Sequence, residues 1–260
     1  MKRLPGLAYG ALAYGAFLCA FVYLVAFVGD LGVPKSVNAG GEVDGLFALA
    51  VNLTLIALFG LQHSLMARKG FKRWLGEFLP ASAERSTFVL ATSVVLGMLF
   101  VLWQPIPADI WVLEGVPAIL LSVGFWLGWL LVVTASFLTG HLEFAGLRQS
   151  WLAYRRRRPG PMPFVVHSLY RFVRHPMYLG LLAGFWLTPR MTVGHLLFAA
   201  GMTGYLLVGM RLEERDLVRH YGRRYRAYRR RVPALVPHPG SSAAVVPSTV
   251  ARDEAGGRSL

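Results

Sequence analysis

Two short polar segments interrupt the long apolar stretches of this chain. The first, residues 168–180, reads Ser-Leu-Tyr-Arg-Phe-Val-Arg-His-Pro-Met-Tyr-Leu-Gly. The second, residues 213–216, reads Glu-Glu-Arg-Asp and closes another apolar run. Ionisable side chains beside membrane-length segments are costly to bury, and they mark a binding site when they face a cavity. These two segments are therefore the main candidate site for a ligand.

Other catalytic signatures are missing from the sequence. It contains no phosphate-binding Walker loop, no Gly-x-Gly-x-x-Gly and no Gly-x-Ser-x-Gly. Its seven histidines show no His-x-x-x-His or His-Glu-x-x-His spacing, and the lone cysteine, Cys19, lies in an apolar run. We therefore expect neither a metal site nor an intrachain disulfide.

The composition indicates an integral membrane protein. Of 260 residues, 55% are hydrophobic and only 15% are charged, against roughly 25% charged in soluble domains. The net charge of +14 is concentrated in a few segments. In a membrane protein this pattern reports topology first and contact with anionic lipid headgroups second. No soluble basic module of the kind that binds nucleic acid is present, so nucleic acid is not an expected partner.

Apolar runs of about twenty residues predict an all-α, polytopic membrane bundle. Four spans are expected, followed by a fifth apolar unit, 177–210, which Thr-Pro-Arg at 188–190 divides. The first arm of this unit is too short to cross a core of about 30 Å, so we expect a helical hairpin with its turn near Pro189. The four expected spans are residues 6–29, 45–67, 86–103 and 116–138.

The charges between these spans predict the orientation. Residues 68–85 and 148–174 are rich in Lys and Arg, whereas residues 30–44 and 109–114 are poor in them. This alternation places both termini in the cytoplasm under the positive-inside rule, for which we expect a bacterial inner membrane. Because the hairpin returns the chain to the same side, the two polar segments should meet at one face.

The end of the chain predicts an amphipathic helix and a tail. Apolar residues recur at helical spacing from Leu217 to Val232 with arginines between them, and this helix is entered through Glu213 and Glu214. Residues 240–260 are rich in Ser, Ala, Gly and Val, which is typical of disorder. We therefore expect a membrane domain at 1–211, a cytoplasmic helix completing the site at 212–237, and a disordered tail at 238–260.

The two polar segments also resemble a known signature. Arg-His-Pro-x-Tyr-x-Gly at 174–180, with the glutamate pair and two later tyrosines, resembles the isoprenylcysteine carboxyl methyltransferase-like membrane methyltransferases. The resemblance implies a site for S-adenosylmethionine, with Gly180 allowing close packing of the hairpin. It implies that the pocket is lined by Tyr170, Arg174, His175 and Tyr178, and that Glu213 and Glu214 bind the cofactor's amino group or ribose hydroxyls.

Further segments narrow the resemblance to the methanethiol S-methyltransferases. It extends over residues 6–237 and implies methylation of methanethiol to dimethyl sulfide. The segments that carry it are 59–68, 71–74, 84–87, 103–105, 146–149 and 192–196.

Methylation of a small thiol needs a group that removes or holds the thiol proton, because free thiols titrate near ~8.5. His63, at the end of the second span beside Gln62 and Ser64, is the first candidate for the base, and Tyr178 could orient the thiol. His141 and Glu143 are alternatives. Arg148 and Gln149 could reach the cofactor or anchor the chain to lipid headgroups.

Other functions stay open from the residues alone. The same signature would suit methylation of a lipid-linked cysteine carboxylate or of a phospholipid amine, which needs a lipid-wide portal between helices. A non-catalytic membrane protein of the same fold is the alternative from another class.

Overall fold

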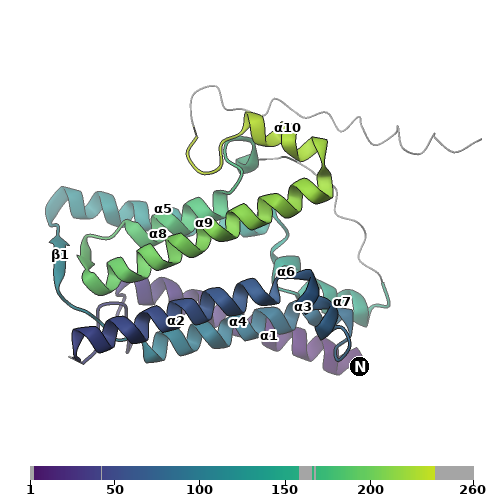
Figure 1. Ribbon diagram of the computed structural model, residues 1–260, viewed down its shortest axis with the longest axis horizontal. Coiled ribbons are helices and arrows are strands. Elements are labelled where there is room, and N and C mark those ends of the chain that lie inside the picture. Colours follow the sequence, from purple (N-terminus) through teal and green to yellow (C-terminus); the bar gives the residue numbers. More distant parts are fainter. Residues whose placement is uncertain (1–2, 42, 158–165, 167, 238–260) are drawn as a thin grey trace, which may run out of the picture.

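Five long apolar helices frame the protein in the computed structural model, which describes residues 3–41, 43–157, 166 and 168–237 (Figure 1). With 22–29 residues at about 1.5 Å each, these helices are long enough to cross a core of about 30 Å. The protein is a polytopic helical membrane protein, as predicted. The five helices are α1 (Arg3–Gly29), α2 (Gly45–Met66), α4 (Ala81–Leu102), α5 (Gly115–Leu138) and α9 (Val193–Tyr221).

Short helices connect the spans and lie near their ends. The third span begins at Ala81 rather than at the predicted Ser86, and its N-cap is Pro80 in an extended conformation. The short elements are α3 (Lys69–Leu75), α6 (His141–Phe144), α7 (Leu147–Tyr154), the 3-10 turn η1 (Ser168–Arg171), α8 (Pro176–Trp186) and α10 (Arg223–Arg231).

The predicted hairpin is confirmed as α8 and α9. Pro176 occupies the first turn of α8, where a missing N–H is harmless. The turn contains a strand that the sequence analysis did not predict: β2 (Arg190–Thr192) pairs antiparallel with β1 (Asp109–Val112). The hairpin turn is therefore joined to the loop that precedes α5.

Helix α8 packs against α5 at very short range. A Cβ built on Gly180 would lie 2.6 Å from the carbonyl oxygen of Gly128, and one on Gly184 would lie 2.8 Å from the ring of Trp129. Only glycine fits at these two positions, one turn apart on α8. This confirms the close packing expected of Gly180, with α5 as the partner helix.

The end of the chain differs from the prediction. The helix expected to begin at Glu213 is instead the continuation of α9, which runs without a break to Tyr221. Gly222, with φ of +56°, ends it, and α10 follows. The predicted apolar positions therefore lie on two helices, but they still pack together, because Tyr225, Tyr228 and Val232 form one cluster with Leu217 and other apolar residues. The predicted tail at 238–260 and Arg158 lie outside the described residues, and the domain division at 211 stays a prediction.

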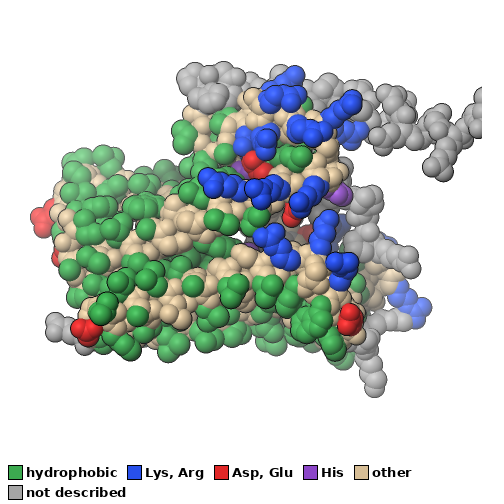
Figure 2. Space-filling model, viewed as in Figure 1, with side chains coloured by type: hydrophobic (Ala, Val, Ile, Leu, Met, Phe, Trp, Pro, Cys, Tyr) green, Lys and Arg blue, Asp and Glu red, His purple; other side chains and the backbone are tan. Residues whose placement is uncertain are grey.

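Helix α2 joins two groups of helices. Helix α5 packs on α8 and α1 packs on α4, while α2 contacts both α4 and α9 (Figure 1). Aromatic rings fill the centre: Phe198 lies 5.7 Å from Trp103 and 5.4 Å from Phe185, measured between ring centroids. Hydrophobic side chains cover the flanks, and Lys and Arg gather around the end where α9 meets α10 (Figure 2). The candidate residues lie at this arginine-rich end.

Candidate functional site

A buried ion pair links the two polar segments. One carboxylate oxygen of Glu214, Oε1, accepts from Nε and Nη2 of Arg174, each at 2.7 Å, and lies 3.1 Å from Nε2 of His175. The three side chains are 13%, 10% and 6% exposed. The predicted meeting of the two segments is confirmed. We call Arg174, His175 and Glu214 the Arg174–Glu214 cluster.

The same arginine fastens the C-terminal segment. Its Nη1 donates to the carbonyl oxygens of Arg229, at 3.1 Å, and Val232. The backbone amides of residues 174–175 donate to the carbonyls of residues 233–234 at 2.9 and 3.0 Å. The guanidinium that the sequence analysis assigned to the pocket thus has internal partners on two segments, and it holds the chain after α10 against the start of α8.

Glu213 forms a second and more open pair. Its Oε2 accepts from the hydroxyl of Tyr178 at 2.7 Å, and its side chain is 49% exposed. The rings of Tyr178 and His175 stack in parallel, with centroids 5.2 Å apart and planes at 7°. We call Tyr178 and Glu213, which share this hydrogen bond, the Tyr178–Glu213 pair. It presents a carboxylate beside a flat aromatic surface, which suits a cationic ligand with a planar base.

Tyr170 lies beside this pair. Burial, together with the nearby Glu213 carboxylate, raises the pKa of Tyr170 to about 12, so its hydroxyl is neutral at pH 7. Its carbonyl oxygen accepts from the hydroxyl of Tyr228 on α10 at 2.6 Å. All six signature residues are therefore brought to one place: Tyr170, Arg174, His175, Tyr178, Glu213 and Glu214.

His63 has a partner that the sequence analysis missed. Its Nδ1 lies 2.6 Å from the hydroxyl of Tyr205 on α9, and its Nε2 has no hydrogen-bond partner in the part of the chain that the structure describes. The rings of Phe88 and His63 pack edge to face. The guanidinium of Arg85 lies over the ring of Phe88, 4.9 Å from its centroid. We call His63 and Tyr205 the His63–Tyr205 pair. Tyr205 stands eight residues before Glu213, a spacing that puts both on one face of a helix.

His141 and Glu143 are engaged elsewhere. The ring nitrogens of His141 lie 3.0 Å from the hydroxyls of Tyr14 and Ser136, and burial lowers its pKa. Glu143 forms an ion pair with Arg148. With both nitrogens occupied, His141 links α1 to α5 and is a poorer candidate for the base than His63.

Arg148 and Gln149 lie on α7 and contact Glu143 rather than the Arg174–Glu214 cluster. Gln149 donates to the carbonyl of Glu143 at 3.0 Å, and its Oε1 is buried without a hydrogen-bond partner among the described residues. A buried acceptor of this kind is costly when left unsatisfied. It could accept from a bound hydroxyl or ammonium group.

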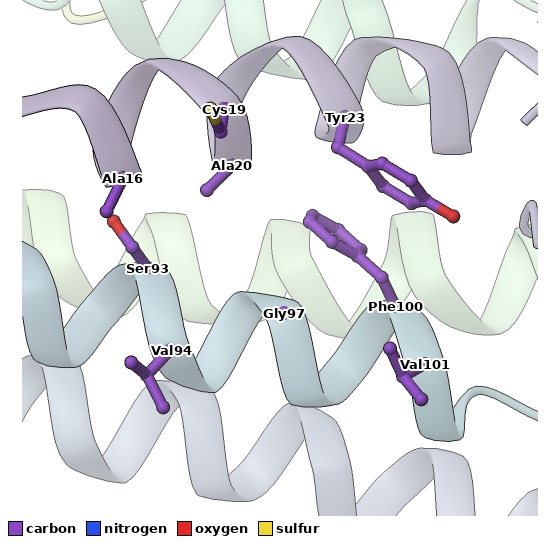
Figure 3. Close-up of a pocket in the computed structure, with 9 residues that line it drawn as sticks. All are labelled: Ala16, Cys19, Ala20, Tyr23, Ser93, Val94, Gly97, Phe100 and Val101. Atoms are coloured by element: carbon purple, nitrogen blue, oxygen red, sulfur yellow. The ribbon is translucent and has the colours of Figure 1, made fainter.

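A separate groove of about 400 Å³ lies between α1 and α4 (Figure 3). Its lining is apolar apart from the hydroxyls of Ser93 and Tyr23, which bond to backbone carbonyls. It also contains the thiol of Cys19, which is exposed. The groove has no charged group and is distinct from the signature residues, so it does not supply the candidate site.

The donor set of the site suits an organic ligand rather than a metal ion. Within the described ranges, no three His, Cys, Asp or Glu side chains are grouped so that they could hold a metal. Carboxylate, tyrosine hydroxyl and stacked aromatic groups instead fit a ligand with an amino-acid end and a nucleoside end.

Comparison with known proteins gives close relatives over nearly the whole chain. No family model and no solved structure matches it. It is 49% identical to methanethiol S-methyltransferase of Mycobacterium tuberculosis, over 92% of this chain and 98% of that protein. It is 46% identical to methanethiol S-methyltransferase 2 of Bradyrhizobium diazoefficiens, over 90% and 91%. It is 47% identical to methanethiol S-methyltransferase of Pseudomonas deceptionensis, over 92% and 93%. At these identities and coverages, the chain belongs to the methanethiol S-methyltransferase family.

Proposed function

We propose that this membrane protein transfers a methyl group from S-adenosylmethionine to methanethiol, giving dimethyl sulfide and S-adenosylhomocysteine. Membership of the methanethiol S-methyltransferase family supports the reaction. The observation that carries the proposal is the convergence of the Arg174–Glu214 cluster and the Tyr178–Glu213 pair at one end of the bundle. These side chains come from segments that are about forty residues apart in the sequence.

The cofactor would be held at the Tyr178–Glu213 pair. When bound, S-adenosylmethionine supplies an electrophilic methyl group on a sulfonium sulfur. The half-exposed carboxylate of Glu213 has lone pairs left for an ammonium group or ribose hydroxyls, and the stacked rings of His175 and Tyr178 can face an adenine. Tyr170 stays protonated and can donate. Arg174 and Glu214 would support the cofactor site without contacting the cofactor, because their charges are paired with each other inside the protein.

Arg148 and Gln149 complete the cofactor assignment. Arg148 is 49% exposed, and a guanidinium suits the cofactor's carboxylate. Gln149 has a buried oxygen to satisfy. We assign them to the amino-acid end of the cofactor, which leaves Glu213 for the ammonium or the ribose.

His63 is the proposed base. A thiol near its ordinary pKa of ~8.5 is mostly protonated at neutral pH, whereas the thiolate is the nucleophile. The His63–Tyr205 pair leaves Nε2 able to take the thiol proton. Tyr178 would orient the reacting sulfur.

The location of the site fits a volatile apolar substrate. The five spans place the protein in a membrane, and methanethiol can partition into the bilayer and enter from it. We assign the protein to the bacterial inner membrane with both termini in the cytoplasm, because the Lys/Arg-rich loops alternate with acidic ones. The site then faces the cytoplasmic pool of the cofactor.

The test uses purified protein in detergent with S-adenosylmethionine and methanethiol, and measures dimethyl sulfide in the headspace. We expect product that depends on the protein and on both substrates, and much less of it with Glu213→Gln. Binding of S-adenosylhomocysteine, measured calorimetrically, is the second readout. Binding without product from methanethiol would reject the thiol acceptor, and absence of both would reject the methyltransferase.

A further inference from the structure

One face of α9 carries a polar group at each end and a glycine between them. Tyr205, Gly209 and Glu213 are spaced by four residues, so they line the same side of the helix. Tyr205 contacts His63 of α2, and Glu213 contacts Tyr178 of α8. Gly209 therefore lies between the proposed base and the proposed cofactor site.

Gly209 is not required for helix packing. A Cβ built there would have the hydroxyl of Tyr178, at 4.0 Å, as its nearest neighbour. Gly201 on the same helix is different, since its Cβ would lie 2.9 Å from Ile56. Glycine within a helix is less stable than alanine. Gly204 also has room for a methyl group, but Gly209 differs from it in its place, because it stands between the residues of α9 that contact His63 and Tyr178. The open space beside Gly209 is therefore flanked by both polar pairs.

We propose that the acceptor thiol binds beside Gly209, between the His63–Tyr205 pair and the Tyr178–Glu213 pair, and that this glycine restricts the acceptor to small alkyl thiols. The inference rests on the proposed function and deepens it. The pairs on α2 and α8 bound the subsite on two sides, so an added side chain at Gly209 would compete with the thiol's alkyl group for the same space.

The geometry also gives the path of the proton. With a hydrogen on Nδ1 donated to the Tyr205 hydroxyl oxygen, Nε2 of His63 carries the lone pair. The thiol S–H bond breaks, an N–H bond forms at Nε2, and the sulfur keeps the electron pair. When that pair forms the new bond to the methyl carbon, the bond from this carbon to the cofactor's sulfonium sulfur would break, and its electrons would leave with S-adenosylhomocysteine. Tyr205 does not touch the thiol in this scheme. It is a positioning residue that fixes the tautomer and the ring of His63.

The test compares Gly209→Val with Gly204→Val in the full-length protein. Gly204 is a matched control, because it lies on the same helix and a Cβ there would meet no atom within 4 Å. We expect Gly209→Val to lower kcat/KM for methanethiol at least tenfold and for ethanethiol more steeply, with the affinity for S-adenosylhomocysteine within twofold of the native protein. Gly204→Val should match the native protein in all three values.

Two results would overturn the subsite. Native kcat/KM in Gly209→Val would show that no acceptor occupies this space. A loss of S-adenosylhomocysteine binding in that variant would place the cofactor there instead of the thiol. Failure of the proposed function is a separate outcome, since the native protein would then make no dimethyl sulfide at all.

Discussion

Glu213 and Glu214 are neighbours in the chain but have different surroundings. Glu214 is 13% exposed and receives three donors from Arg174 and His175, whereas Glu213 is 49% exposed and receives one, from Tyr178. Successive residues of a helix point about 100° apart, so α9 directs one carboxylate into the protein and the other toward open space. A single signature therefore combines a carboxylate that fastens the fold with one that stays accessible from outside the protein.

This difference matters for reading mutants. A variant of the Arg174–Glu214 cluster would lose activity even without any contact to the ligand, because the cluster also anchors the chain after α10. Loss of activity identifies a ligand contact only where stability is unchanged.

The largest expected effect is on stability in Glu214→Ala. The substitution leaves the Arg174 guanidinium buried without its counter-charge, and breaking a buried ion pair costs about 3–5 kcal/mol. We expect the free energy of unfolding in detergent, measured by denaturant titration, to fall by this amount. Glu213→Ala is the matched control and should change it by less than about 1 kcal/mol. Equal losses in both variants would contradict the distinction between the two carboxylates.

The histidines also differ in whether their polar atoms are all engaged within the protein, and His63→Ala tests this difference. His141 has both ring nitrogens engaged, whereas His63 keeps Nε2 available. Removal of a general base lowers turnover by about a hundredfold or more, so we expect that fall in kcat with S-adenosylhomocysteine affinity unchanged. His141→Gln, the control, should keep kcat within a few-fold and lower stability instead. A near-native kcat in His63→Ala would exclude it from the mechanism.

A smaller effect is expected from Glu213→Gln. The amide keeps the size of the side chain and can still accept from Tyr178, but it loses the charge that would attract an ammonium group. Hydrogen bonds to charged groups contribute about 1.5–3 kcal/mol, so affinity for S-adenosylhomocysteine should fall about tenfold or more. Calorimetry measures this, and the free energy of unfolding should not change. Native affinity would show that the carboxylate does not contact the cofactor.

Much of the fold could be predicted because it follows from hydropathy. Apolar runs gave the four spans and the hairpin, and Pro189 marked its turn. The β1–β2 pairing could not be predicted, since three- and four-residue strands have no periodic signal and depend on a partner about eighty residues away. The continuation of α9 past Glu213 was also missed, because a change from apolar to charged residues marks the end of an apolar face and not the end of a helix.

The site was predictable where a signature exists and not where partners come from tertiary packing. Tyr170, Arg174, His175, Tyr178 and the two glutamates meet as expected. The pairing of Arg174 with Glu214 was not foreseen, since sequence shows which charges are present and not which of them neutralise each other. Tyr205 was overlooked as one tyrosine in an apolar run. Its eight-residue spacing before Glu213 was the available signal.

Tyr205→Phe is the smallest and most specific test of the comparison. It removes one hydroxyl and keeps the aromatic contacts with Phe59 and His63. A net hydrogen bond contributes about 1 kcal/mol, so misorientation of His63 should lower kcat about fivefold, with S-adenosylhomocysteine affinity unchanged. Tyr178→Phe is the matched variant, because its hydroxyl bonds to Glu213, and there the affinity should fall. The two tyrosines lie on either side of Gly209. A lower kcat in Tyr205→Phe alone, with a lower affinity in Tyr178→Phe alone, would therefore place the acceptor between them. The same change in both variants would mean that the His63–Tyr205 pair belongs to the cofactor site.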